Sequence, residues 1–276
     1  MDIRHPVHPD HAKIMDTADL RRHFLITDLF QPGKLNLTYS HYDRIIVGGI
    51  CPGKEELVLK GGKELGSEYF LEGREAGVIN IGEAGWVKAD GTRYDLGPRD
   101  AIYLGRGIKE LSFGSVDPSK PAKLYLNSGP AHAAYPTKRI TLQDAKKVHL
   151  GSREESNERT INQYIHPAVL EACQLSMGMT LLEPGCVWNT MPCHTHERRM
   201  EVYFYFDLPK DGVVFHYMGE PEETRHIVVR NEEVVLSPSW SLHSGVGTCG
   251  YTFIWGMVGE NKTFTDMDNI PMSVLK

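Results

Sequence analysis

The sequence has few cysteines and no long apolar run, and these absences narrow the classes of protein to consider. The 276 residues contain five cysteines, an odd number, and no Cys-x-x-Cys pair. Thiols in such a chain are expected to be reduced, which predicts a cytoplasmic protein. No apolar stretch approaches the length of a membrane span, and the first residues lack the basic-then-apolar order of a signal peptide. We therefore expect no membrane partner.

The sequence also lacks a basic patch with interleaved aromatic residues, and its formal net charge is -6. Both features argue against nucleic acid as a partner. They do not exclude an anionic substrate, because the local charge around a site decides that. Hydrophobic residues make up 41% and charged residues 24%, which is ordinary for a globular protein. The length allows one large domain or two of common size.

Short apolar runs separated by glycine- and proline-rich turns dominate the sequence from residue 43 onward. Many short strands at near-regular spacing are typical of β-sandwiches and β-barrels. We predict an all-β protein with short helices only in the arm and the connector. The predicted parts are an N-terminal arm at 1–42, a first β domain at 43–130, a polar connector at 131–160 and a second β domain at 161–276.

Four residues of the second β region have the spacing of a metal site. His194 and His196 are two residues apart in a predicted strand, so their imidazoles point to the same face. Glu201 follows a short turn and can return to that face, and His243 can supply a fourth ligand. Three imidazoles and one carboxylate suit zinc, which we favour at one ion per subunit, but also iron, manganese, nickel or cobalt.

The two β regions can be aligned as copies of one pattern. In this alignment the first region has no histidine at the ligand positions. Glu110 lies opposite His243, and Phe70, Glu72 and Gly77 lie opposite His194, His196 and Glu201. The first region is therefore predicted to be a scaffold or an oligomer interface, and the second region to carry the site.

The order His-x-His-x4-Glu, followed by Pro-x4-His at residues 238–243, resembles the two motifs of cupins. Cupins are double-stranded β-helix barrels in which the first motif supplies His, His and Glu and the second supplies one more His. Trp240 stands where glycine is usual in the second motif. The resemblance implies two cupin barrels in one chain, the first of them degenerate and without metal ligands.

Longer strings resemble a narrower family, the 5-keto-4-deoxyuronate isomerases, also called 4-deoxy-L-threo-5-hexosulose-uronate ketol-isomerases. They lie at residues 37–49, 184–206, 239–248 and 253–261. The resemblance implies a zinc ion held by the four ligands named above, a hexamer, and a keto-uronate as the small-molecule substrate. The implied reaction converts 5-dehydro-4-deoxy-D-glucuronate to 3-deoxy-D-glycero-2,5-hexodiulosonate in pectin and uronate degradation. Glycosaminoglycans are the alternative source, because they yield related uronates.

Four further residues are candidates for work on such a substrate. Glu201, Tyr203 and Tyr205 are every second residue of the predicted strand, so their side chains point to the same face. Either tyrosine can therefore hydrogen-bond substrate or relay a proton. Aromatic packing is the alternative for both. A uronate carboxylate calls for an arginine, which binds it with two parallel hydrogen bonds. Arg198 and Arg199 lie in the predicted turn and are the candidates, with a solvated turn as the alternative.

Two other functions use the same residues. An iron-dependent cupin oxygenase has the same four ligands and consumes oxygen. A non-catalytic cupin that binds sugar acids shows binding without turnover. The complete ligand set argues against the second alternative, and the long matching strings favour the isomerase over both.

Overall fold

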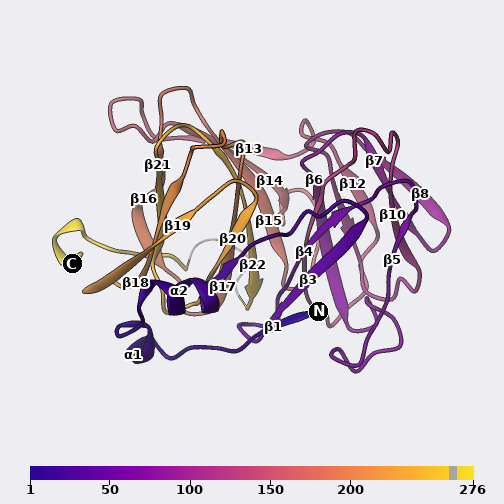
Figure 1. Ribbon diagram of the computed structural model, residues 1–276, viewed down its shortest axis with the longest axis horizontal. Helices are drawn as coiled ribbons and strands as arrows, with labels where there is room; N and C mark the ends of the chain where they lie inside the picture. Colours follow the sequence, from indigo (N-terminus) through magenta and orange to yellow (C-terminus); the bar gives the residue numbers. More distant parts are fainter. Residues whose placement is uncertain (261–265) are drawn as a thin grey trace. The chain divides into compact units, whose positions relative to one another are not determined.

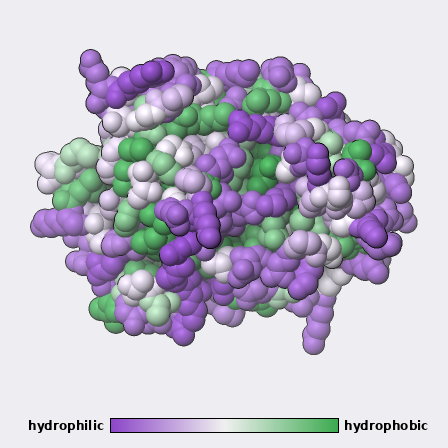
Figure 2. All heavy atoms as spheres, turned by 45° about the horizontal axis from the view of Figure 1, so that its top comes forward, coloured by the Kyte–Doolittle hydropathy of each residue, from purple (hydrophilic) through white to green (hydrophobic). Residues whose placement is uncertain are grey.

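The computed structural model describes residues 1–260 and 266–276 (Figure 1). Strands dominate it, and the prediction of an all-β fold is confirmed. The helices in the described residues are short: α1 (Pro9–Ala12), α2 (Thr17–Phe24) and the 3-10 helix η1 (Met272–Val274). None of them is long and apolar enough to cross a membrane. On the face in Figure 2, hydrophilic residues predominate and hydrophobic residues lie in small groups between them.

The chain forms two compact units, each assembled from three segments. Unit 1 contains residues 1–4, 28–145 and 164–177, and unit 2 contains residues 5–27, 146–163 and 178–276.

Unit 1 is built on two sheets. The seven-stranded sheet has the order β1 (Asp2–Arg4), β3 (Lys34–Ser40), β4 (Ile46–Cys51), β11 (Leu124–Pro130), β6 (Arg74–Asn80), β9 (Ala101–Leu104), β12 (Lys138–Ile140). The four-stranded sheet has the order β5 (Leu57–Leu59), β10 (Leu111–Ser115), β7 (Gly85–Ala89), β8 (Thr92–Leu96).

The strands of unit 2 also belong to two sheets. The seven-stranded sheet has the order β13 (Lys146–Leu150), β14 (Arg159–Ile165), β15 (Ser176–Leu182), β22 (Thr252–Gly259), β17 (Arg199–Phe206), β20 (Glu233–Ser237), β2 (Leu25–Ile26). The five-stranded sheet has the order β19 (Glu223–Val229), β18 (Val214–Glu220), β21 (His243–Gly247), β16 (Trp188–Thr195), β23 (Asp268–Asn269).

The two seven-stranded sheets follow the same plan, in agreement with the predicted internal repeat. β6 pairs with β11 and β9, and β17 pairs in the same antiparallel way with β22 and β20. Ala76, the third residue of β6, pairs with Leu104 at the end of β9. Glu201, the third residue of β17, pairs with Ser237 at the end of β20. The strand pairing therefore makes Ala76 the equivalent of Glu201. The sequence alignment instead makes Gly77, the next residue, the equivalent.

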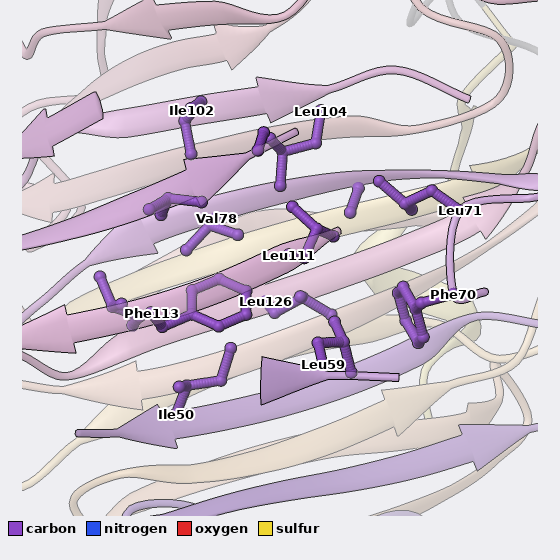
Figure 3. Packing of buried hydrophobic residues seen from close by; sticks show 14 of the residues in the cluster. Ile50, Leu59, Phe70, Leu71, Val78, Ile102, Leu104, Leu111, Phe113 and Leu126 are labelled. Carbon is purple, nitrogen blue, oxygen red and sulfur yellow. The ribbon is translucent and has the colours of Figure 1, made fainter. Parts of the chain in front are cut away.

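An apolar core lies between the two sheets of unit 1. Val78 and Leu126 come from the first sheet, and Leu111 and Phe113 come from the second, and all four belong to one packed cluster (Figure 3). All four are at most 2% exposed, so each contributes about 1.5–3 kcal/mol to stability by its removal from water. Alternation along these strands directs every second side chain into this layer.

The predicted arm and connector contribute strands to these sheets. β1 and β3 come from the arm, and β12 and β13 come from the connector. The compact units therefore cut across the predicted boundaries at 42, 130 and 160, because strand pairing recruits polar segments that look like linkers in the sequence. In unit 2, β2 from the arm forms the edge of the sheet beside β20, with Leu25 opposite Val235. The division into four domains stays a prediction.

Candidate metal centre

Three strands of unit 2 and one turn bring the four predicted ligands together. His194 on β16 lies directly opposite His243, the first residue of β21, in an antiparallel pair. Glu201 lies on β17, which belongs to the other sheet of unit 2. His196 stands in the short turn between β16 and β17. One ligand atom from each of the four lies within 4.8 Å of all the others.

The separations between these atoms suit a tetrahedral ion. His243 Nε2 is 3.1 Å from Glu201 Oε2 and 3.1 Å from His194 Nε2. His196 Nε2 is 3.2 Å from Glu201 Oε2. Metal–ligand bonds of about 2.0–2.1 Å at tetrahedral angles place neighbouring ligand atoms about 3.3 Å apart. Three of the six separations therefore stand close to the spacing that a central zinc-sized ion requires, and all six lie within 4.8 Å.

Backbone carbonyls orient two of the imidazoles. His196 Nδ1 is 2.9 Å from the carbonyl oxygen of Arg199, and His243 Nδ1 is 3.3 Å from that of Ser241. A carbonyl oxygen only accepts hydrogen bonds, so we infer that the proton of each ring is on Nδ1. The Nε2 lone pairs then point into the cluster, which is the tautomer of a metal-bound histidine. The donor set fits a divalent cation.

Electrostatics favour the same protonation states for His194, His243 and Glu201, but not for His196. Burial lowers the pKa of His194 to about 3, and it also lowers the pKa of His243. Burial by itself raises the pKa of Glu201, but His243 and His196 outweigh it and hold that pKa below its usual value. For His196 the hydrogen bond to Glu201 outweighs burial, so its pKa is raised. Glu201 is therefore an anion beside the neutral rings of His194 and His243, as metal binding requires.

A cavity of about 300 Å³ opens beside the cluster. His194 and Glu201 form part of its wall, and most of the remaining wall is apolar. Its other lining residues are Val148, Leu150, Arg159, Ile161, Gln163, Thr180, Thr190, Pro192, Tyr203, Phe253, Trp255, Met257 and Met267. A small concave site with a few polar groups in an apolar wall is typical of small-molecule binding.

Two polar residues of β14 line this cavity, and the sequence analysis missed both. Arg159 donates from Nη1 to the carbonyl oxygen of Asn157 at 2.8 Å, and burial lowers its pKa. Gln163 Oε1 is buried without a hydrogen-bond partner among the described residues. With Ile161, they occupy alternate positions of one strand, which is the signal that could have identified them.

Tyr203 and Tyr205 lie in different surroundings. Tyr203 lines the cavity, and its hydroxyl is 3.2 Å from Thr190 Oγ1. Burial and the nearby Glu201 raise the pKa of Tyr203 well above its usual value, so it is a neutral phenol. Tyr205 is not part of the cavity wall, and its hydroxyl lies 2.7 Å from His216 Nδ1.

Neither predicted arginine lines the cavity. Arg198 is exposed in the turn, where its Nη2 is 2.9 Å from Glu260 Oε2. Arg199 is not in a solvated turn, as the sequence analysis allowed, because it begins β17 and is 1% exposed. Its guanidinium pairs with Asp266, and its Nε lies 3.0 Å from the sulfur of Met257. Contact of either arginine with substrate stays a prediction, and Arg159 is the arginine that lines the cavity.

Comparison with solved structures defines the class of fold. An IolB-like protein from Salmonella typhimurium LT2 matches with a TM-score of 0.73 at 15% identity, over 90% of this chain and 96% of that one. The oxalate decarboxylase of Lactobacillus farciminis, in a formate complex, matches with a TM-score of 0.60 at 10% identity, over 94% and 88%. Fold and site together define an all-β protein of the cupin class with a cluster of three histidines and one glutamate that can hold a metal ion.

Sequence comparison narrows the class. The model of the KduI/IolB family matches residues 24–272. The 4-deoxy-L-threo-5-hexosulose-uronate ketol-isomerase of Caldicellulosiruptor bescii is 56% identical over 276 residues, and that of Yersinia pestis (strain Pestoides F) is 58% identical over 278 residues. Both matches cover 100% of each chain. The chain belongs to the KduI/IolB family, and the resemblance identified in the sequence is confirmed.

Proposed function

We propose that this protein is a ketol-isomerase that converts 5-dehydro-4-deoxy-D-glucuronate to 3-deoxy-D-glycero-2,5-hexodiulosonate in pectin and uronate degradation. The observation that carries the proposal is the identity of 56–58%, over the full length, with enzymes named for that activity. The cavity beside four convergent ligand residues supports it, because it offers a small-molecule site next to a potential metal ion.

The metal in this proposal is zinc, one ion per subunit, held by His194, His196, Glu201 and His243. A divalent ion bound there supplies a Lewis acid that polarises a carbonyl oxygen. The four side chains keep their donor atoms in place through strand pairing and the carbonyl contacts of His196 and His243. Their burial, between 1% and 5% for Glu201 and the two histidines after His194, keeps water from competing for the ligand atoms.

Arg159 is the residue that we propose for the substrate carboxylate. It lines the cavity, and among the described residues its guanidinium donates one hydrogen bond, from Nη1 to a backbone carbonyl, so the rest of the guanidinium is available. A planar guanidinium matches a carboxylate with two parallel hydrogen bonds. Gln163 Oε1, buried without a described partner, is placed to accept a hydrogen bond from a substrate hydroxyl.

Tyr203 is the proposed proton donor to a substrate oxygen. The reaction moves a proton between neighbouring oxygens as well as between carbons, so a hydroxyl that stays protonated is needed at the oxygen that gains charge. The raised pKa of Tyr203 keeps its proton in place until such charge develops. The rings of Phe253 and Trp255 form an apolar part of the same wall.

Two broader statements belong to the proposal. A cytoplasmic location is supported by the cysteines, all five of which are free. A hexameric assembly rests on the family resemblance alone.

The deciding experiment supplies the purified protein with the unsaturated uronate released by a polysaccharide lyase and follows the product by NMR. We expect isomerisation that stops on addition of a chelator and returns with zinc. An oxygen electrode in the same reaction separates the alternative, because an oxygenase consumes oxygen as product forms. Saturable binding with no turnover in the presence of zinc, iron or manganese would overturn the isomerase proposal.

The two tyrosines provide a matched pair of variants. We expect Tyr203→Phe to lower kcat about 100-fold, the lower range for loss of a general acid, with little change in KM. Tyr205→Phe, which removes a hydroxyl outside the cavity, should retain most of kcat. Equal kcat values for the two variants would remove Tyr203 from its proposed role.

A further inference from the structure

Unit 1 contains a cavity of about 370 Å³ that is unlike the apolar layer between its sheets. Three arginines line it, Arg44, Arg74 and Arg106, together with Tyr39 and Ser67. None of these residues takes part in the metal centre. Such a concentration of guanidinium groups at one concave site requires a physical explanation.

Arg74 is the central residue because it is buried without a counter-charge. It begins β6 and is 9% exposed. Its Nε donates to Ser128 Oγ at 3.1 Å, and its Nη2 donates to the carbonyl oxygens of Ser128 and Arg44. These acceptors are neutral, and no carboxylate among the described residues pairs with Arg74. Burial lowers its pKa to about 10, which reflects the cost of a charge that lacks a partner.

The other two arginines extend the positive charge. Arg106 is held by backbone carbonyls: its Nε donates to that of Glu72 at 2.8 Å and its Nη1 to that of Ala131 at 3.2 Å. Its Nη2 makes no hydrogen bond within the described part of the chain. Arg44 has a φ of 56°, an uncommon conformation for a residue other than glycine, and its carbonyl is held by Arg74. The positive φ of Arg44 and the hydrogen bond from Arg74 thus occur at the same point of the cavity wall.

The remaining wall is mixed and includes two carboxylates, Glu64 and Glu72, but these form no ion pair with the arginines among the described residues. Glu72 accepts a hydrogen bond from the backbone N–H of Glu68. Ser67 Oγ is buried without a hydrogen-bond partner among the described residues. The ring of Tyr39 lies 5.9 Å from Cζ of Arg74. A hydroxyl and an aromatic face thus stand beside the arginines.

We propose that this cavity binds a small organic anion, with its carboxylate or phosphate group held by Arg74, Arg44 and Arg106. Guanidinium groups match both oxyanions through parallel hydrogen bonds. A volume of about 370 Å³ lies within the range of small-molecule sites. Ser67 and Tyr39 contact hydroxyl groups or the ring face of the ligand. The bound anion supplies the counter-charge that the fold withholds from Arg74.

Isothermal titration of the intact, metal-loaded protein tests the proposal. The probes are inorganic phosphate, D-glucuronate and, as the neutral control, D-glucose, all at matched ionic strength. We expect saturable binding of phosphate, of glucuronate or of both, and none of glucose. Binding of only one anion identifies the oxyanion that the site prefers. No saturable binding of either anion would overturn the proposal.

Variants locate the binding. Arg44→Gln removes an exposed guanidinium and should raise Kd about tenfold, the usual effect of one lost charge-assisted hydrogen bond. Arg93→Gln, another exposed arginine of unit 1 outside the cavity, is the matched control and should leave Kd unchanged. Arg74→Gln should weaken binding further. If Arg74→Gln fails to fold, Arg44→Gln decides: an unchanged Kd in that variant contradicts the proposal. The readout is binding, so it stands or fails independently of isomerase activity.

Discussion

Arg74 and Arg199 occupy equivalent positions in two similar sheets but have different partners. Each is the first residue of a central strand, β6 in unit 1 and β17 in unit 2, and each is buried. Arg199 pairs with the carboxylate of Asp266. Arg74 donates only to neutral oxygens and borders a cavity.

This difference shows that equivalent positions in the two sheets can have different roles. In both units the ladder directs the first side chain of the strand into a buried polar environment, and two residues later it places Glu201 in one unit and Ala76 in the other. What each position does depends on residues that arrive from elsewhere in the chain. In unit 2 the surrounding groups are three histidines and the carboxylate of Asp266. In unit 1 they are neutral oxygens and two further arginines.

The largest effect is expected where the two units differ most, at the ligands. Glu201→Gln keeps the shape of the side chain but removes its charge, so we expect loss of bound metal and a fall in kcat/KM of more than about 100-fold, beyond the usual effect of an outer-shell change. Metal analysis and the isomerase assay measure both. Glu110→Gln, at the counterpart of His243, is the control and should change neither. Retention of full metal content and activity by Glu201→Gln would contradict the ligand assignment.

The next effect concerns the counter-charge of Arg199. Asp266→Asn leaves a buried guanidinium unpaired, so we expect the free energy of unfolding to fall by about 3 kcal/mol. Glu260→Gln breaks the neighbouring pair with Arg198, whose side chains are 62% and 76% exposed, and should cost about 0.5 kcal/mol. Urea unfolding of the two variants measures the difference. Equal losses would mean that burial does not distinguish the two arginines.

The smallest predicted effect separates the proposed anion sites of the two units. Arg159→Gln removes the proposed carboxylate contact and should raise KM about 30-fold, equivalent to a loss of about 2 kcal/mol. Arg198→Gln and Arg44→Gln should each leave KM within about twofold, since the first is solvated and the second lies in unit 1. Steady-state kinetics decides. A KM change in Arg198→Gln as large as in Arg159→Gln would instead indicate that the substrate carboxylate binds at the turn that contains Arg198.

The ligand cluster was predictable because its geometry is local. His194, His196 and Glu201 come from one short segment of the sequence, although His196 lies in the turn after β16 and not in the predicted strand; only His243 comes from a distant segment. The burial and ion pairing of Arg199 were not predictable, because they depend on Asp266, which is distant in the sequence. The adjacent letters Arg198 and Arg199 contain nothing that separates an exposed side chain from a buried one.

The missed residues of β14 show a second limit. Arg159, Ile161 and Gln163 alternate as a strand requires, but the predicted boundary at 160 separated Arg159, assigned to the polar connector, from Ile161 and Gln163 in the second β domain. Polar residues facing a cavity and polar residues facing solvent are identical in a sequence. The one-residue difference between Gly77 and Ala76 has a related cause, because hydrogen-bond register is a property of paired strands and not of letters.

The edge strand β2 pairs with β20, which lies far from it in the sequence and is therefore synthesised much later. During synthesis Leu25 emerges early, but its partner Val235 emerges 210 positions later (235 − 25). The outer edge of β20 therefore has no strand partner until the N-terminal segment returns to it, and contacts of such separation form slowly. β20 also holds Ser237, the neighbour of Glu201. Leu25 and Ile26 thus help to close the sheet that carries Glu201, one of the proposed metal ligands.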